Sequence, residues 1–181
     1  MSGDAAKAID TLLKEGANVS TSGAIKLRAR IGQFESEANK LVEEAAKRGE
    51  VVDKAFVMSE ITKELKKFRT QVNPGADTQA ILKSWDEFRQ MVGAKIQVAE
   101  AHALKKGTYS ILADKYAKQG AVENVPGTQA QMAMARGLRK GSEEVVPGLG
   151  EVTAAESKII NAHDIAERRA AIEANKDEGG I

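Results

Sequence analysis

The sequence predicts an all-α protein, an elongated bundle of about six helices joined by short turns. Three observations predict this class. Ala, Glu, Lys, Leu and Arg are frequent, and aromatic residues make up only 4 % of the 181 residues, which is typical of long helices that pack through narrow seams. Apolar residues recur at steps of three and four, and no segment alternates as a half-buried strand does. Each proline stands before a glycine in a turn-like setting, at Pro74, Pro126 and Pro147.

Two helices are predicted in the first fifty residues. The first covers 4–15; the second covers 23–48, with Thr21 or Ser22 as its cap and Gly49 as its stop. The apolar face of the first comprises Ile9, Leu12 and Leu13. The second has an unbroken heptad seam, formed by Leu27, Ile31, Phe34, Ala38, Leu41 and Ala45.

Helical spacing continues through the middle of the chain. A helix is predicted over 50–72, with a seam of Met58, Ile61, Leu65, Phe68 and Val72. After a turn, a long helix runs from Asp77 or Thr78 to Gly107, and a further helical segment follows to Gly120. The long helix carries Leu82, Trp85, Phe88, Val92, Ile96, Ala99 and Ala103. A glycine inside a helix costs about 1 kcal/mol relative to alanine, so Gly93 is interpreted as a close crossing with another helix.

The last fifty residues predict a helical hairpin over 128–174. Its first helix opens at Thr128 and carries Met132, Ala135, Leu138 and Val145; its second covers 151–174 and carries Val152, Ile159, Ile165 and Ile172. Pro147 stops the first helix, and Gly148 and Gly150 permit the reversal. The chain is divided into an N-terminal helical region, 1–75, with heptad seams, and a C-terminal region, 76–181, unless the two form one continuous domain.

Composition excludes several kinds of protein. There is no cysteine, which removes disulfides, thiolate zinc sites and thiol catalysis. No run approaches the roughly 18 apolar residues of a membrane span, and the start lacks the pattern of a secretory signal. The net charge of +1 argues against strong general attraction to nucleic acid or anionic lipid.

Candidate catalytic and metal-binding groups are sparse. His163 and Glu167 stand four residues apart and could share one helix face, but neither they nor His102 has a third ligand at a recognisable spacing. No metal and no cofactor are therefore predicted. The acidic pairs lie among lysines and arginines and are interpreted as solvated helix faces rather than catalytic dyads; they are Glu43 with Glu44, Glu60 with Glu64, and Glu143 with Glu144. An enzyme built from scattered carboxylates is the weakest of the hypotheses.

Two basic clusters leave a nucleic-acid site open. They are Lys63, Lys66, Lys67 and Arg69, and Arg136, Arg139 and Lys140. Such residues make phosphate contacts. Acidic residues lie within a turn of each cluster, so the same residues also predict salt bridges on helix surfaces. A nucleic-acid-associated helical module of a mobile element is the alternative function.

Within 79–169, "VAEAHALKKGTYSILADKYAKQG" is an alanine-rich helix with a Lys-x-Gly-x-Tyr step, and "MAMARGLRKGSEEVVPGLGEVTAAESKIINAHDIAERRA" follows it. In this order of parts, the region resembles a helical segment of phage- and prophage-encoded proteins. Related segments occur in virion structural or ejected proteins and in polyvalent mobile-element proteins. The resemblance covers about half of the chain and includes no catalytic motif, so it implies assembly rather than a reaction.

The expected function is that of a non-enzymatic structural protein of a bacteriophage particle, associated with the tail, the portal or DNA ejection. It would be made in the bacterial cytoplasm and reside in the virion. Its partners would be copies of itself and other virion proteins, with nucleic acid as a further partner and no membrane span. The residues expected to mediate interactions are Leu27, Ile31, Phe34, Leu41, Arg136, Arg139, Pro147, Ile159 and Ile165.

Overall fold

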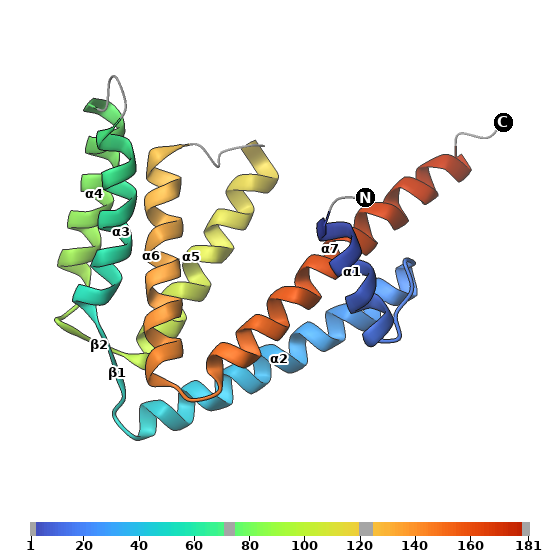
Figure 1. The fold of residues 1–181 in the computed structure, drawn as a ribbon, viewed down its shortest axis with the longest axis horizontal. Coiled ribbons are helices and arrows are strands. Elements are labelled where there is room, and N and C mark those ends of the chain that lie inside the picture. The colour runs from blue at the N-terminus through green and yellow to red at the C-terminus, as the bar shows by residue number, and fades with distance from the viewer. Residues whose placement is uncertain (1–2, 71–74, 120–124, 179–181) are drawn as a thin grey trace. The chain divides into compact units, whose positions relative to one another are not determined.

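A computed structural model of the protein describes residues 3–70, 75–119 and 125–178, which form seven helices and two short strands (Figure 1). The predicted all-α class is confirmed. The helices are α1 (Gly3–Lys14), α2 (Thr21–Lys47), α3 (Lys54–Arg69), α4 (Gly75–Met91), α5 (Val98–Gln119), α6 (Pro126–Val145) and α7 (Leu149–Glu178). The strands are β1 (Val51–Asp53) and β2 (Lys95–Gln97). Three residues used in the sequence predictions, Val72, Pro74 and Gly120, lie outside the described residues.

The chain divides into two compact units. The first consists of Met1–Lys40 and Leu149–Ile181, and the second of Leu41–Gly148. The boundary predicted between residues 75 and 76 falls inside the second unit instead. The reason is that α1 packs against α7, from the other end of the chain, whereas α3 and α4 pack against each other and against α6.

The first unit has a small core. Its buried cluster comprises Leu12, Ala24, Leu27, Ile159, Ala162 and Ala166, half of which are alanines. Helix α1 ends in a turn at Gly16, which has a φ of 57°, and the Ala17 amide donates to the Leu12 carbonyl at 2.9 Å. This is a glycine C-cap of the kind that ends many helices. Helix α2 is capped by Ser20, whose hydroxyl accepts from the Gly23 amide at 3.2 Å, and not by Thr21 or Ser22 as predicted.

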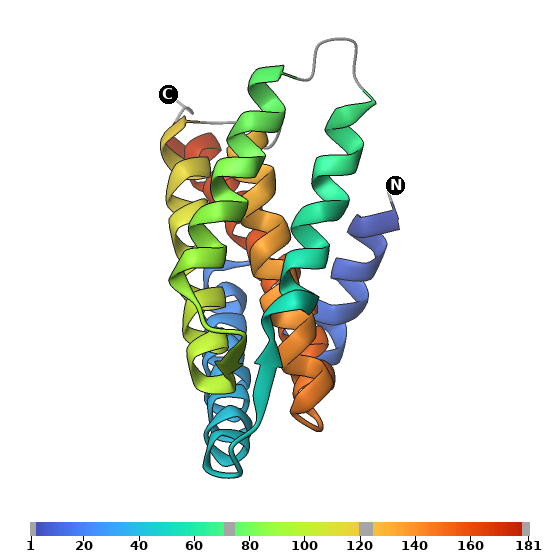
Figure 2. The same cartoon turned by 90° about the vertical axis from the view of Figure 1, so that its left-hand side faces the viewer.

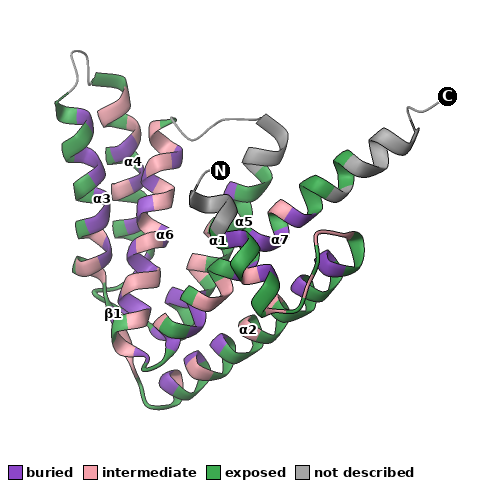
Figure 3. Cartoon of the chain, turned by 45° about the vertical axis from the view of Figure 1, so that its right-hand side comes forward, coloured by how far each residue is buried: buried purple, intermediate pink, exposed green. Residues whose placement is uncertain are grey.

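Helix α6 forms the centre of the second unit. It packs against α3, α4 and α5, which lie around it in Figure 1. From 126 to 145 only Glu144 is fully exposed, and the buried character of α6 is visible in Figure 3. The largest fully buried side chains around it belong to Phe88, Ile61, Ile81, Ile96, Leu138, Val52, Val57 and Val98.

Two glycines allow α6 to approach β1 and α3 closely. A Cβ placed on Gly137 would lie 3.0 Å from the Cα of Val57, and one on Gly141 would lie 2.5 Å from Cγ1 of Val52. Both distances are shorter than the contact distance of about 3.5–4.0 Å between carbon atoms. These close approaches occur at Gly137 and Gly141 of α6, and the close helix crossing predicted at Gly93 was wrong. Gly93 itself lies in the loop between α4 and β2.

The long helix predicted over 77–107 is interrupted by a strand. Strand β2 pairs with β1 in antiparallel register, Val52 opposite Ile96 and Asp53 opposite Lys95; the pair is seen in Figure 2. Val52 and Ile96 are both fully buried. The predicted absence of strands was wrong here because three residues are too few to show alternation, and the ladder forms only when α3 and α4 bring the two segments together. Gly107, predicted as a break or kink, lies inside α5.

Helix α6, predicted as the first helix of the hairpin over 128–174, packs against α3, α4 and α5, and α7, predicted as its second helix, packs against α1. The turn itself follows the expected chemistry: α6 ends at Val145, and Gly148 has a φ of 83°, a conformation that glycine adopts at little cost. Gly150, however, is already within α7.

Candidate functional site

Four of the predicted interaction residues meet in the core of the first unit. Leu27 and Ile159 are buried there, and Ile31 and Phe34 are partly buried against the same cluster. The guanidinium carbon of Arg30 lies 4.6 Å from the centre of the Phe34 ring. These four side chains hold the unit together, so most of their surface is not offered to a partner.

Leu41 and Pro147 come together in the second unit. Leu41 is half-buried and Pro147 is exposed. Both line a surface groove of about 330 Å³, together with Glu44, Arg48, Glu50, Val145 and Val146. Charged side chains at this groove are partly paired, since Nε of Arg48 lies 3.8 Å from a carboxylate oxygen of Glu50.

Large apolar side chains are exposed on all three helices of the first unit. They are Ile9 and Leu13 on α1, Ile25 on α2, and Ile160 and Ile172 on α7. Leu13 is 73 % exposed and Ile25 66 % exposed, whereas Leu12 is buried. The predicted face of Ile9, Leu12 and Leu13 is therefore split, because only Leu12 faces the core. Ile165, the remaining predicted apolar contact, is half-buried, whereas Ile172, predicted as an anchor, is exposed.

Helices α3 and α6 bring two residues of each predicted basic cluster to one face. Glu64 on α3 accepts from Lys67 of its own helix at 2.8 Å and lies 3.4 Å from the Arg136 guanidinium on α6. One turn earlier, Glu60 pairs with Lys63 and lies 3.4 Å from Nζ of Lys140. We call these four basic and two acidic residues the basic face.

The two carboxylates of the basic face are buried. Glu60 is 3 % exposed and Glu64 is 4 % exposed, which corrects their interpretation as a solvated helix face. A hydrogen bond from Lys63, and then one from Lys140, lowers the pKa of Glu60 despite its burial. Both glutamates alternate with the apolar residues of α3 that pack inward, Val57, Ile61, Leu65 and Phe68. That 3–4 spacing is a sequence signal that could have revealed their burial.

Arg139 does not join the basic face through these carboxylates. Its Nε lies 3.7 Å from a carboxylate oxygen of Glu143 on the same helix. This contact is the helix-surface salt bridge that the sequence predicted for the second cluster.

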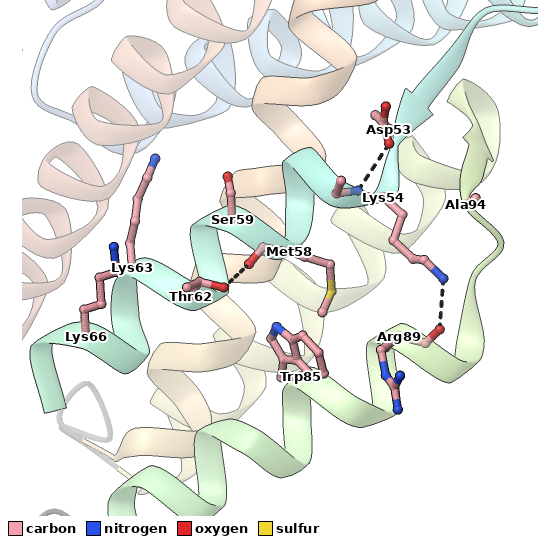
Figure 4. A pocket seen from close by; sticks show the side chains of 11 residues that line it. Asp53, Lys54, Met58, Ser59, Thr62, Lys63, Lys66, Trp85, Arg89 and Ala94 are labelled. Carbon is pink, nitrogen blue, oxygen red and sulfur yellow. Dashed lines mark hydrogen bonds between the residues drawn. The ribbon is translucent and has the colours of Figure 1, made fainter. Parts of the chain in front are cut away.

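A groove between α3 and α4, beside the basic face, was not predicted. It has a volume of about 610 Å³, and the described residues that line it are Asp53, Lys54, Ala55, Met58, Ser59, Thr62, Lys63, Lys66, Trp85, Arg89 and Ala94. We call it the Trp85 groove. Figure 4 shows the Met58 and Trp85 side chains lying side by side in it, with Lys63 and Lys66 further along α3. In the sequence, the available sign of this groove was the helical spacing of basic and aromatic residues on α3 and α4. The packing of the two helices, which the sequence does not show, brings these residues together.

The charges of the Trp85 groove are mainly positive. Four of its lining residues are basic and one is acidic. Nζ of Lys54 is held by the carbonyls of Arg89 and Val92 at 3.2 and 2.9 Å. The Arg89 guanidinium carbon lies 5.3 Å from the centre of the Trp85 ring, within the range of a cation–π contact. The acidic residue, Asp53, caps α3 and accepts from Lys95 at 2.9 Å, and this bond lowers its pKa.

The two histidines occupy different surroundings. His163 is 9 % exposed, and its Nε2 lies 3.4 Å from a carboxylate oxygen of Glu167, so the predicted proximity of these two is present. Among the described residues, no group of three or more His, Asp or Glu side chains is placed to hold a metal ion. His102 is 8 % exposed; burial, and then the charges of Lys105 and Lys106, lower its pKa to about 4.

Comparison of the chain with known protein families, with curated proteins and with solved structures gives no match. In the part of the chain that the structure describes, no helix has both the length and the hydropathy that crossing a membrane requires.

Proposed function

We propose that the chain is a non-enzymatic structural protein that acts by helix–helix association, as a component of a bacteriophage particle near the tail, the portal or the ejection apparatus. Its proposed partners are copies of itself and other particle proteins, and its proposed location is the virion. The observation that carries this proposal is the combination, in the first unit, of a small core with exposed apolar side chains on every helix.

Among the described residues, the buried cluster of the first unit combines three large apolar side chains with three alanines. The alanines contribute much less apolar area than leucine or isoleucine. Small units with little buried apolar area are commonly completed by association. A structural role is therefore supported by the alanine-rich buried cluster of this unit together with the apolar side chains exposed on its surface.

The exposed residues on α1 form a stripe. Ile9 and Leu13 are four residues apart and hence adjacent on one helix face, and they are 46 % and 73 % exposed. Single exposed apolar residues are common on soluble proteins, whereas extended contiguous apolar patches mark association surfaces. A second copy or another helical particle protein would bury this stripe against an apolar face of its own.

The carboxylate pair on α3 also fits a structural role. Glu60 and Glu64 are each held by one lysine of α3 and one basic residue of α6. Carboxylates engaged in this way join two helices. General acid–base catalysis would instead need carboxyl groups in a pocket whose pKa values are pushed apart.

The mass in solution tests the proposal. Light scattering over a range of protein concentrations should show an oligomer, and Leu13→Lys should reduce it to the monomer. Ile111→Lys is the matched control, because Ile111 is a 56 % exposed apolar residue of the second unit. A wild-type protein that remains monomeric, or equal loss of assembly in both variants, would refute association through α1. Detection of the chain in purified phage particles by mass spectrometry tests its location.

A further inference from the structure

We infer that the Trp85 groove binds single-stranded nucleic acid, with a base stacked on Trp85 and the backbone phosphates against Lys63, Lys66 and Arg89. This inference goes beyond the assembly function, and it concerns the second unit, whereas the proposed association surface lies in the first.

The groove combines an aromatic face with separated positive charges. Trp85 is half-buried, so the position of its ring is supported by neighbours while part of it remains accessible. Base stacking on such rings is tolerant of sequence, because every base has a π face. Met58 extends the apolar floor beside Trp85 (Figure 4).

The cations are placed to follow a chain of phosphates rather than one anion. Lys63 and Lys66 stand three residues apart on α3 and hence are neighbours on one helix face, and Arg89 lines the same groove from α4. Lys66 has no ion pair within the described residues, and the side chains of Lys63 and Arg89 are 62 % and 54 % exposed although each has an acidic neighbour.

The basic face adds to the positive potential beside this groove. Lys63 belongs to both surfaces. The other cations of the basic face are Lys67 of α3 and Arg136 and Lys140 of α6. Only two carboxylates offset the four cations of the basic face, and both are buried. With four positive and two negative charges, the basic face has a formal charge of +2, whereas the net charge of the whole chain is +1.

A single strand fits this arrangement better than a duplex or an acidic peptide. A duplex keeps its bases stacked, so Trp85 could not reach a base face. An acidic peptide would satisfy the cations, but it offers no planar partner for the indole. Free phosphate would leave the Met58 and Trp85 floor unused.

The test is fluorescence anisotropy of the full-length chain with labelled oligothymidylate and oligouridylate, repeated at several salt concentrations. Both strands should bind, with affinity falling as salt rises. Trp85→Ala should weaken binding about tenfold, the effect of losing one stacked base, and Trp85→Phe should retain part of it. Lys66→Ala should reduce the salt slope by about 0.7, the contribution of one phosphate contact on a single strand.

Lys83→Ala is the matched control, because Lys83 is on the same helix as Trp85, its side chain is 78 % exposed, and it does not line the groove. It should bind as the wild type does. Circular dichroism of each variant excludes loss of folding as the cause. No binding by the wild type, equal weakening in Lys83→Ala, or equal affinity for a duplex or for polyglutamate would overturn the inference. If only oligothymidylate or only oligouridylate binds, the proposed ligand is single-stranded DNA or single-stranded RNA, respectively.

Discussion

Replacing Gly141 by alanine tests the close contact between α6 and β1. The new Cβ would lie 2.5 Å from Cγ1 of Val52 and 3.5 Å from Cδ1 of Phe56. Val52 is fully buried, so its methyl group cannot turn into solvent. The two segments must separate by about 1 Å to restore an ordinary carbon–carbon contact.

Two opposing terms set the size of the effect. Overpacking of a core costs about 1–3 kcal/mol, and alanine gains about 1 kcal/mol over glycine inside a helix. The expected net change is a loss of up to about 2 kcal/mol in the free energy of unfolding. In a chain of this length that lowers the melting temperature by up to roughly 8 °C.

Gly107→Ala is the control, because it should raise the free energy of unfolding rather than lower it. Gly107 is inside α5, and a Cβ there would meet nothing within 4 Å. This variant should gain about 0.5–1 kcal/mol, since only the helix propensity changes.

Urea unfolding followed by circular dichroism measures both variants. If Gly141→Ala were stabilised as much as Gly107→Ala, the close crossing at α6 would be refuted. The double variant Gly141→Ala with Val52→Ala provides a further check. It should be less destabilised than the sum of the single variants, because the smaller residue 52 relieves the contact.

Three further predictions concern single residues. Leu27→Ala should lower the free energy of unfolding by about 2–5 kcal/mol, as the loss of a buried leucine does. Phe34→Ala, at a half-buried site, should cost clearly less than the roughly 3–5 kcal/mol of a buried phenylalanine. Equal costs in chemical unfolding would show that both residues belong to the core. Burial lowers the pKa of His102 to about 4 in the folded protein, below its ordinary value of 6.5, so the unfolded state takes up a proton at a higher pH than the folded state does. The stability that neutral, buried His102 contributes is complete above pH 6.5 and should decline by up to about 3 kcal/mol towards pH 4. The variant His102→Gln should flatten that part of the curve of stability against pH. An unchanged curve would contradict the effect of burial on this pKa. Gly148→Ala should cost about 1–2 kcal/mol because its φ of 83° is unfavourable for an L-residue, and no loss of stability would mean that the turn relaxes.

Much of the secondary structure was predictable because its causes are local. The 3–4 spacing of Leu27, Ala38 and Ala45 follows a helix face, and all three are buried on α2. Gly49, predicted as the stop of that helix, has a φ of 77°, and the turn after α6 follows from the chemistry of Pro147 and Gly148. Each of these signals lies within a few residues of its effect.

The strands and the candidate groove were not predictable in this way. Val52 and Ile96 are 44 residues apart and pair only because the packing of α3 and α4 brings their flanking segments together. Within a three-residue strand, periodicity cannot be told from that of a helix. The same helix pair places Trp85 beside Met58, a contact that no local pattern encodes.

The sequence by itself determined that this protein is helical and where most of its helices begin and end, because helix propensity and capping act over short distances. Only the tertiary structure decided which helix is central, which glycines permit close packing, and that Glu60 and Glu64 are buried between cations of two helices. Those features depend on which helix faces pack together. The free energy of burying a charge depends on the hydrogen-bonding and ionic partners that surround it, and these come from other helices.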